Sequence, residues 1–229
     1  MDDNEPGMIG ESVSEASAAG EADGNLRNMG AAIAICAALI LFGGSTFALW
    51  TLEFDVEGFT TVEIEFGARE AGTDVTVMGM SESETIAYSD SDCECDAMNS
   101  FSTLVSVMVA VLLIFGVALG YMGHSGEKME FAPKVIVGAA LISVIILLYT
   151  FMSLPQAFED DESDDEEEGF FEIFDEDPAF FSDHEISNDG VSGSLKTTAG
   201  MGFFLPIVTL GLCGYLIRDR GITLEDITG

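Results

Sequence analysis

Basic residues and histidines are scarce in this chain. Its 229 residues include seven Lys and Arg against 41 Asp and Glu, a formal net charge of −34 at pH 7, and two histidines, His124 and His184. Nucleic-acid-binding proteins neutralise phosphates with Lys and Arg, so this balance opposes nucleic acid as a partner. The sequence also lacks a Ser-His-Asp order, a glycine-rich phosphate loop and an HExxH motif. These absences predict a protein that is not an enzyme and has no dedicated cofactor.

Charged residues are nearly absent from four long apolar runs. These runs cover 29–50, 101–122, 132–154 and 199–217, and they contain no Asp, Glu, Lys, Arg or His apart from Lys134. Each is close to the ~20 residues that a helix needs to cross a bilayer. We therefore expect a mainly α membrane protein, a bundle of four transmembrane helices. Ionisable groups inside spans mark ion and proton pathways, so their absence argues against transport by a single chain.

The four spans divide the chain into alternating apolar and polar segments. The expected order is a disordered acidic tail (1–28), a first span (29–50), a β-rich loop (51–100), a second span (101–122), a short loop (123–131), a third span (132–154), an acidic loop (155–198), a fourth span (199–217) and a tail (218–229). The first segment cannot bury a core, and it lacks the basic start of a signal peptide. We expect the first span to be retained as a signal-anchor.

The few basic residues predict the orientation. Lys and Arg near span ends favour the cytoplasmic side, whereas acids contribute little. Five basic residues fall on one side of the predicted spans: Arg27, Lys128, Lys134, Arg218 and Arg220. Arg69 and Lys196 fall on the other. This bias predicts a multi-pass protein of the cell membrane, with both termini in the cytoplasm and both long loops outside.

The first long loop predicts a small antiparallel sheet. Apolar and acidic residues alternate over 51–57 and 62–66, which gives one apolar and one acidic face. Weaker third and fourth strands are expected over 74–80 and 85–88, and the apolar face is expected to rest on the helix ends or on a partner. The order of one span, an external sheet and three further spans is similar to that of claudin-type proteins. The Gly-Leu-Trp motif and spaced cysteine pair of that family are absent, so the similarity is limited to this order.

Two cysteines and several carboxylates cluster where this loop ends. Asp92, Cys93, Cys95 and Asp96 lie within five positions. An external, oxidising location favours a disulfide between Cys93 and Cys95. Two alternatives are pairing with another chain and a divalent metal site, because thiolates and carboxylates are both metal ligands.

The second long loop combines an acidic run with aromatic residues. Nine of the ten residues over 159–168 are acidic, and such a run predicts an extended, solvated loop. The aromatic residues that follow could fold back on the sheet, enter the membrane interface or anchor a partner: Phe170, Phe171, Phe174, Phe180 and Phe181. A loose EF-hand pattern places candidate calcium ligands at Asp164, Glu166, Glu168, Glu172 and Asp175. Weak binding of Ca²⁺ or Mg²⁺ is the expectation here.

Small residues in the spans predict close helix packing. Gly116 and Gly120 form a GxxxG spacing, which lets helix backbones approach each other in lipid. Packing within the chain is the first interpretation, and a homo-oligomer through these glycines is the second.

Together these features predict a structural, accessory or assembly component of the cell envelope. Its partners would be the lipid bilayer and other membrane or envelope proteins, with the acidic external surface meeting cations or a basic partner. The alternative is a divalent-cation-binding component of an oligomeric channel or transporter complex.

Overall fold

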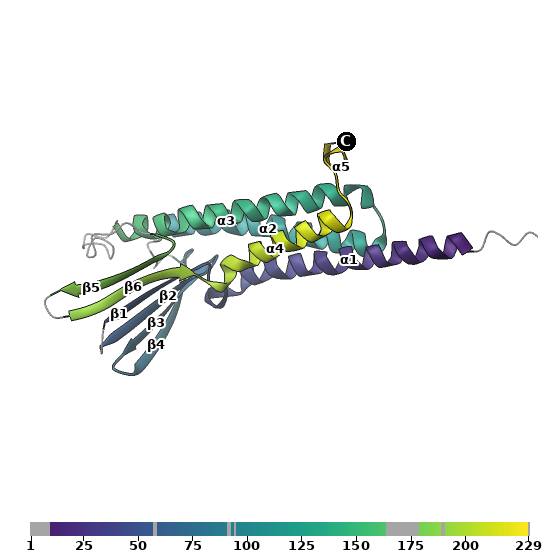
Figure 1. Cartoon of the computed structure of the whole chain (residues 1–229). Coiled ribbons are helices and arrows are strands. Elements are labelled where there is room, and N and C mark those ends of the chain that lie inside the picture. Colours follow the sequence, from purple (N-terminus) through teal and green to yellow (C-terminus); the bar gives the residue numbers. More distant parts are fainter. Residues whose placement is uncertain are drawn as a thin grey trace, which may run out of the picture.

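The computed structural model describes residues 10–56, 59–90, 93, 95–163, 179–188 and 191–228. A bundle of long helices carries a β-sheet at one end (Figure 1). The long helices are α1 (Gly10–Phe42), α2 (Asp96–Ser125), α3 (Ala132–Ser163) and α4 (Met201–Asp219), and the short α5 (Leu224–Thr228) lies at the end opposite the sheet. Two 3₁₀ turns are η1 (Gly44–Phe47) and η2 (Met129–Phe131). The four predicted spans are confirmed as helices long and apolar enough to cross a membrane.

Each long helix packs against two others, in the ring α1, α2, α3, α4 and back to α1. On α2 the buried residues Val105, Val109, Leu112 and Leu119 recur at spacings of three, four or seven and so share one face. Large apolar residues also cover the outside of the bundle: Ile114, Val117, Leu141, Leu148 and Phe204 are each more than 40% exposed. An apolar exterior around an apolar core is typical of helices surrounded by lipid.

Four small residues set the crossing of α1 and α2. A Cβ atom added to Gly116 would lie 2.5 Å from the backbone nitrogen of Ala34, and one added to Gly30 would collide with the backbone of Gly120. Gly30 and Ala34 on α1 thus face Gly116 and Gly120 on α2, each pair four residues apart. The GxxxG spacing is used for packing within the chain. This is the first of the two interpretations of the sequence, and a homo-oligomer through these glycines stays a prediction.

Three helix boundaries differ most from the prediction. Helix α1 includes residues 10–28 of the expected disordered tail, where Ala and Glu favour a helix. It ends at Phe42 rather than at residue 50, because Gly44 adopts a positive φ of 60° and the remaining apolar residues turn into the sheet. Helix α3 continues nine residues past the expected end at Leu154, since Leu154 and Ala157 are buried.

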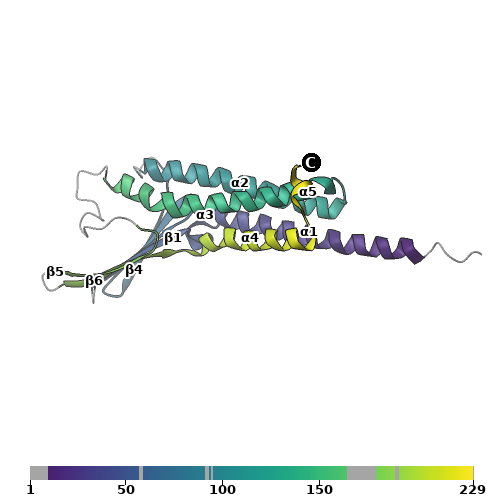
Figure 2. The same cartoon turned by 45° about the horizontal axis from the view of Figure 1, so that its top comes forward.

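The sheet has six antiparallel strands rather than the three or four predicted. Strands β1 (Trp50–Val56), β2 (Thr60–Phe66), β3 (Glu70–Val77) and β4 (Met80–Ala87) come from the first long loop. Strands β5 (Ser182–Asn188) and β6 (Val191–Ala199) come from the second. The order is β4-β3-β2-β1-β6-β5, so β1 pairs with β6 and joins the two loops into one sheet (Figures 1 and 2).

The sheet is fixed to the bundle where β1 follows α1 and β6 leads into α4. The backbone nitrogen of Gly202 donates a 2.7 Å hydrogen bond to the carbonyl oxygen of Ala48. A Cβ atom on Gly202 would collide with the carbonyl oxygen of Phe47, so only glycine permits this approach. Trp50, fully buried, packs between the rings of Phe66 and Phe180, with centroid separations of 5.0 and 6.3 Å.

Candidate functional site

The two faces of the sheet differ in character, as the alternation over 51–57 and 62–66 predicts. On β1 and β2, Trp50, Leu52, Phe66 and Ile64 point to one side, where the ring of Phe158 on α3 packs 5.0 Å from that of Phe66. The apolar face therefore rests on the helix ends, which is one of the two outcomes expected from the sequence. The opposite side carries the acidic residues.

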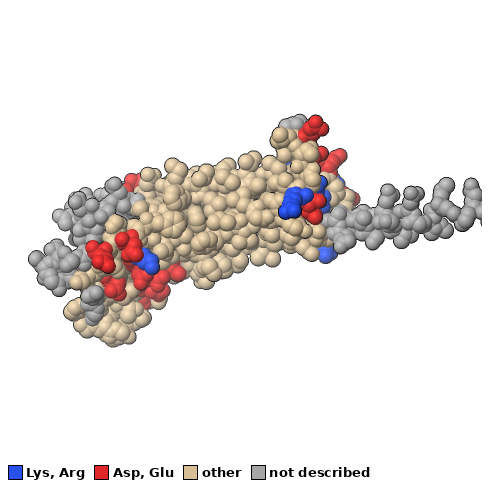
Figure 3. Space-filling view, in the orientation of Figure 1, with Lys and Arg blue, Asp and Glu red and all other residues tan. Residues whose placement is uncertain are grey.

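The acidic side of the sheet, here named the acidic face, draws residues from both long loops. Its carboxylates are Glu53, Asp55, Glu63, Glu65, Glu70, Asp74, Asp183 and Glu185. Strand pairing aligns five residues of this face in one row across the sheet: Asp74, Glu63, Glu53, Lys196 and Asp183. All five side chains in this row are exposed. Figure 3 shows acidic side chains gathered over the sheet end of the molecule, with a basic residue among them.

Like charges lie directly opposite each other in this row. Glu63 is paired in register with Glu53 on one side and with Asp74 on the other. The consequence is visible at Glu65, the next residue on this face of β2. Partial burial, followed by the charges of Glu63 and Asp74, raises the pKa of the Glu65 carboxyl above its ordinary value. Neighbouring carboxylates on the acidic face thus repel one another, and this repulsion contributes to the raised pKa of Glu65.

The cysteines at the end of the first loop are paired. Cys93 and Cys95 form a disulfide with a Cα–Cα distance of 5.1 Å. A disulfide leaves no thiolate for a metal, so this pairing favours the structural alternative over the metal site. Asp96 is exposed at the start of α2, and Asp92 lies outside the described residues. The disulfide borders a cavity of about 310 Å³ with Tyr88 and Phe158.

The acidic run predicted as a solvated loop has a structural role at its start. Residues 159–163 continue α3, and the carboxylate of Asp161 accepts hydrogen bonds of 2.7 and 2.8 Å from the backbone N–H groups of Ala97 and Met98. These N–H groups belong to the first turn of α2, where helical partners are missing. Asp161 therefore caps α2 from another helix. The alternating pattern of the sequence did not reveal this contact, because it joins segments more than 60 residues apart.

The calcium pattern lies outside the part of the chain that the structure describes. This applies to Asp164, Glu166, Glu168, Glu172 and Asp175, and also to Phe170, Phe171 and Phe174. Among the described residues, no group of three or more His, Cys, Asp or Glu side chains is placed to hold a metal ion. The two histidines are separated, since His124 lies near the end of α2 away from the sheet and His184 lies on β5.

The interior of the bundle offers few polar groups. The hydroxyls of Ser143 and Thr209 donate to the carbonyl oxygens of Ala139 and Leu205, four residues earlier on their own helices. The buried hydroxyl of Thr150 has no hydrogen-bond partner among the described residues. The hydroxyls of Ser143 and Thr209 are therefore satisfied within their own helices.

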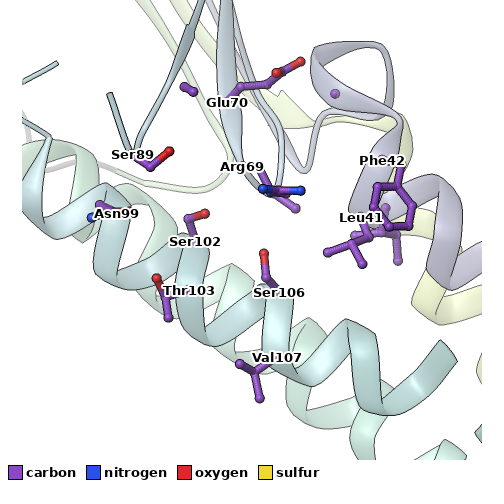
Figure 4. A pocket seen from close by; sticks show the side chains of 14 residues that line it. Leu41, Phe42, Arg69, Glu70, Ser89, Asn99, Ser102, Thr103, Ser106 and Val107 are labelled. Carbon is purple, nitrogen blue, oxygen red and sulfur yellow. The ribbon is translucent and has the colours of Figure 1, made fainter. Parts of the chain in front are cut away.

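A cavity of about 620 Å³ lies beneath the acidic face, between the sheet and the outer turns of α1 and α2. Its polar lining comes from the turn before β3, which supplies Arg69, and from α2, which supplies Asn99, Ser102, Thr103 and Ser106. These α2 residues recur at spacings of three and four and form one polar stripe. Figure 4 shows Arg69 extending from the sheet toward Ser102 and Ser106, with Leu41 and Phe42 beside it. The sequence patterns did not reveal this arrangement.

Fold and surface together define a class: a bundle with four candidate spans that carries one antiparallel sheet built from two loops. No protein-family model matches the sequence, and no curated protein matches it.

Proposed function

We propose that this protein is a non-enzymatic, four-pass component of the cell envelope whose acidic face docks a basic partner outside the cell. The bundle would hold the protein in the cell membrane, with both termini in the cytoplasm. The observation that carries this proposal is the row of exposed carboxylates that runs in register through Asp74, Glu63 and Glu53. Like charges directly opposite each other destabilise a sheet, so a cationic partner would relieve a cost that the free protein bears.

The distribution of charge supports the orientation. Lys128, Lys134, Arg218 and Arg220 belong to the end of the bundle away from the sheet, where Figure 3 shows basic side chains. Under the preference of basic residues for the cytoplasmic side, the sheet end would face outward. An external location also agrees with the disulfide between Cys93 and Cys95, since disulfides persist in oxidising compartments.

A basic macromolecular partner fits the acidic face better than a chelated metal ion. The row extends across five strands, and no described group of acidic side chains is placed to hold a metal. A surface of this shape attracts an extended positive surface and steers it into contact. The alternative, a divalent-cation-binding component of a channel or transporter complex, depends on residues outside the described ranges.

Binding of a defined polycation tests the proposal. Full-length protein in nanodiscs of neutral lipid is titrated with a ten-residue oligolysine. The test variant combines Glu53→Gln, Glu63→Gln and Asp74→Asn, and the control combines Glu82→Gln, Glu84→Gln and Glu159→Gln. Both remove three negative charges, and the control residues are exposed but lie off the acidic face. We expect the test variant to bind about tenfold more weakly, a change of about 1.4 kcal/mol.

An equal loss of affinity in the two variants would contradict a face-specific site and leave only a general negative field. A response to millimolar Ca²⁺ or Mg²⁺ that blocks oligolysine binding in the wild type at constant ionic strength would favour the divalent-cation alternative.

A further inference from the structure

The cavity beneath the sheet combines a cationic group, hydroxyl groups and an apolar wall at one end of the candidate spans. We propose that it is a binding site for a phospholipid of the leaflet on the sheet side, with the lipid phosphate held by Arg69 and the hydroxyls of α2. The proposal does not depend on the partner of the acidic face, because Arg69 and the polar residues of α2 do not belong to that face.

The cationic group is Arg69, one of two basic residues in the segments that form the sheet end. Its side chain is exposed, and among the described residues its guanidinium has no hydrogen-bonded or ion-paired partner. It lines the cavity, and Figure 4 shows it between the sheet and the turn of α2 that carries Ser106. A guanidinium presents a planar set of donors that matches phosphate oxygens, and such charge-assisted hydrogen bonds are among the strongest.

The hydroxyl groups come from the polar stripe of α2. Ser102 and Ser106 face Arg69, and Asn99 and Thr103 extend the stripe along the same two turns (Figure 4). No hydrogen bond joins the side chains of Ser102, Thr103 or Ser106 to another described residue. By contrast, Ser143 and Thr209 elsewhere in the bundle bond back to their own helices. The stripe therefore retains donors for a ligand.

The apolar wall places the cavity beside lipid. Leu41 and Phe42 at the end of α1 and Val107 on α2 supply large apolar side chains to the lining, and Phe42 and Val107 are 68% and 57% exposed. A ligand in this cavity would thus have its polar group under the sheet and its apolar part along the outside of two helices. That division matches a phospholipid, whose phosphate joins the glycerol to the headgroup and whose acyl chains lie in the bilayer.

Glu70 also lines the cavity, but its carboxylate is directed elsewhere. Its Oε1 atom lies against Gly44 of η1, and in Figure 4 the side chain points away from α2. The charge of Glu70 thus does not occupy the space between Arg69 and the hydroxyls. The acidic face above would repel free anions, so the acyl chains are needed for binding, and the proposal concerns a lipid rather than inorganic phosphate.

Native mass spectrometry of the full-length protein released from detergent tests this site. The probe is dioleoyl phosphatidylglycerol, and the variants are Arg69→Ala and Lys196→Ala. Each removes one positive charge from the sheet end, but Lys196 lies on the acidic face. We expect Arg69→Ala to bind the first lipid about tenfold more weakly, as for loss of a hydrogen bond to a charged group, and Lys196→Ala to match the wild type. Equal weakening in both variants, or none in either, would overturn the proposal.

Two further experiments distinguish a specific phospholipid site from a site for free anions and from coverage by bulk lipid. Glycerol 3-phosphate, which carries the phosphate without acyl chains, should not displace the lipid at millimolar concentration. Displacement would show a free-anion site instead. A photoreactive phospholipid should label residues 40–42 and 103–107 of the wild type more than residues 204–208 of α4, whose Phe204 and Val208 are exposed to the same surroundings. Equal labelling of these segments would mean that only bulk lipid covers the cavity.

Discussion

The indole nitrogen of Trp50 donates a 3.0 Å hydrogen bond to the carbonyl oxygen of Phe180, 130 residues later in the chain. Both residues are buried, and the bond ties the first strand of one loop to the approach to the second hairpin. The acidic face exists as one surface only because these two loops are joined. The stability of this junction therefore bears on the proposed function.

Replacing Trp50 should weaken the junction. Trp50→Phe keeps an aromatic ring but removes the donor, leaving a buried carbonyl oxygen without its partner at a cost of about 1–3 kcal/mol. Denaturant unfolding of the purified protein, followed by tyrosine fluorescence, measures the change. Phe204→Leu is the control, because Phe204 is half-exposed on α4. Equal stability of Trp50→Phe and the wild type would contradict a structural role for this bond.

Removing the cap supplied by Asp161 should destabilise the start of α2. Asp161→Ala leaves the backbone N–H groups of Ala97 and Met98 without acceptors, and loss of a capping side chain costs about 1 kcal/mol. Thermal unfolding with circular dichroism provides the measurement. Glu159→Ala, which removes an exposed acid two residues earlier, should change little. If the two variants behave alike, the carboxylate of Asp161 does not cap α2.

The crossing of α1 and α2 should not tolerate a larger residue at Gly116. In Gly116→Val the new side chain would collide with the backbone of Ala34, and overpacking of this kind costs about 1–3 kcal/mol. Gly211→Val is the matched control, since no atom lies within 4 Å of a Cβ at Gly211. Melting temperatures of the two variants, measured in the same detergent, test this prediction, and we expect the lower value for Gly116→Val. A stable, monodisperse Gly116→Val protein would contradict the close approach of these helices.

The repulsion around Glu65 predicts a dependence of stability on pH and salt. The pKa of Glu65 is raised in the folded protein by partial burial and by Glu63 and Asp74. The folded state then holds a proton more readily than the unfolded state, so stability falls as pH rises from the ordinary carboxyl pKa through the raised one. Glu65→Gln should remove this contribution and be more stable than the wild type at neutral pH. The difference should shrink in 1 M NaCl, where the Debye length is about 3 Å.

Comparison of chemical denaturation curves between pH 4 and pH 8 checks the sign of this effect. The conservative variant Thr198→Ser, on the same face, is the control. Greater stability of the wild type than of Glu65→Gln at neutral pH and low salt would contradict net repulsion on the acidic face.

The sequence predicted those parts of the fold that repeat locally. Strands β1 and β2 alternate apolar and acidic residues, and the four spans are continuous apolar runs, so both were identifiable. Strands β5 and β6 were not, because Leu195 is the only large apolar residue in the middle of β6 and burial by β1 stabilises the pair. The cap at Asp161 and the close approach of Gly30 to Gly120 likewise depend on contacts between distant segments. The sequence of each segment shows which secondary structure it favours, but it does not show which distant segment it will contact.

The candidate sites likewise include features that local sequence patterns predict and features that depend on contacts between distant segments. The acidic face was visible from alternation in one loop, whereas the contribution of Asp183 and Lys196 depended on strand pairing. The cavity beneath the sheet could be identified only from the structure, because it depends on Arg69 lying close to α2, a helix that starts 27 residues later. The pairing of Cys93 with Cys95 was one of three alternatives that the sequence left open, beside pairing with another chain and a metal site.

The central claim is that the acidic face lies outside the cell and recruits a basic partner. Its most direct test uses two variants that each add one exposed cysteine to the protein, whose native cysteines are paired (Cys93 and Cys95) or buried (Cys36 and Cys213). Ser83→Cys is paired in register with Asp74 on the acidic side of β4, and Glu84→Cys lies on the opposite side of the same strand. A membrane-impermeant maleimide is added to intact cells with and without the ten-residue oligolysine. We predict that both cysteines react, and that oligolysine slows labelling of Ser83→Cys but not of Glu84→Cys. No labelling of either cysteine in intact cells, or equal protection of both, would contradict the account.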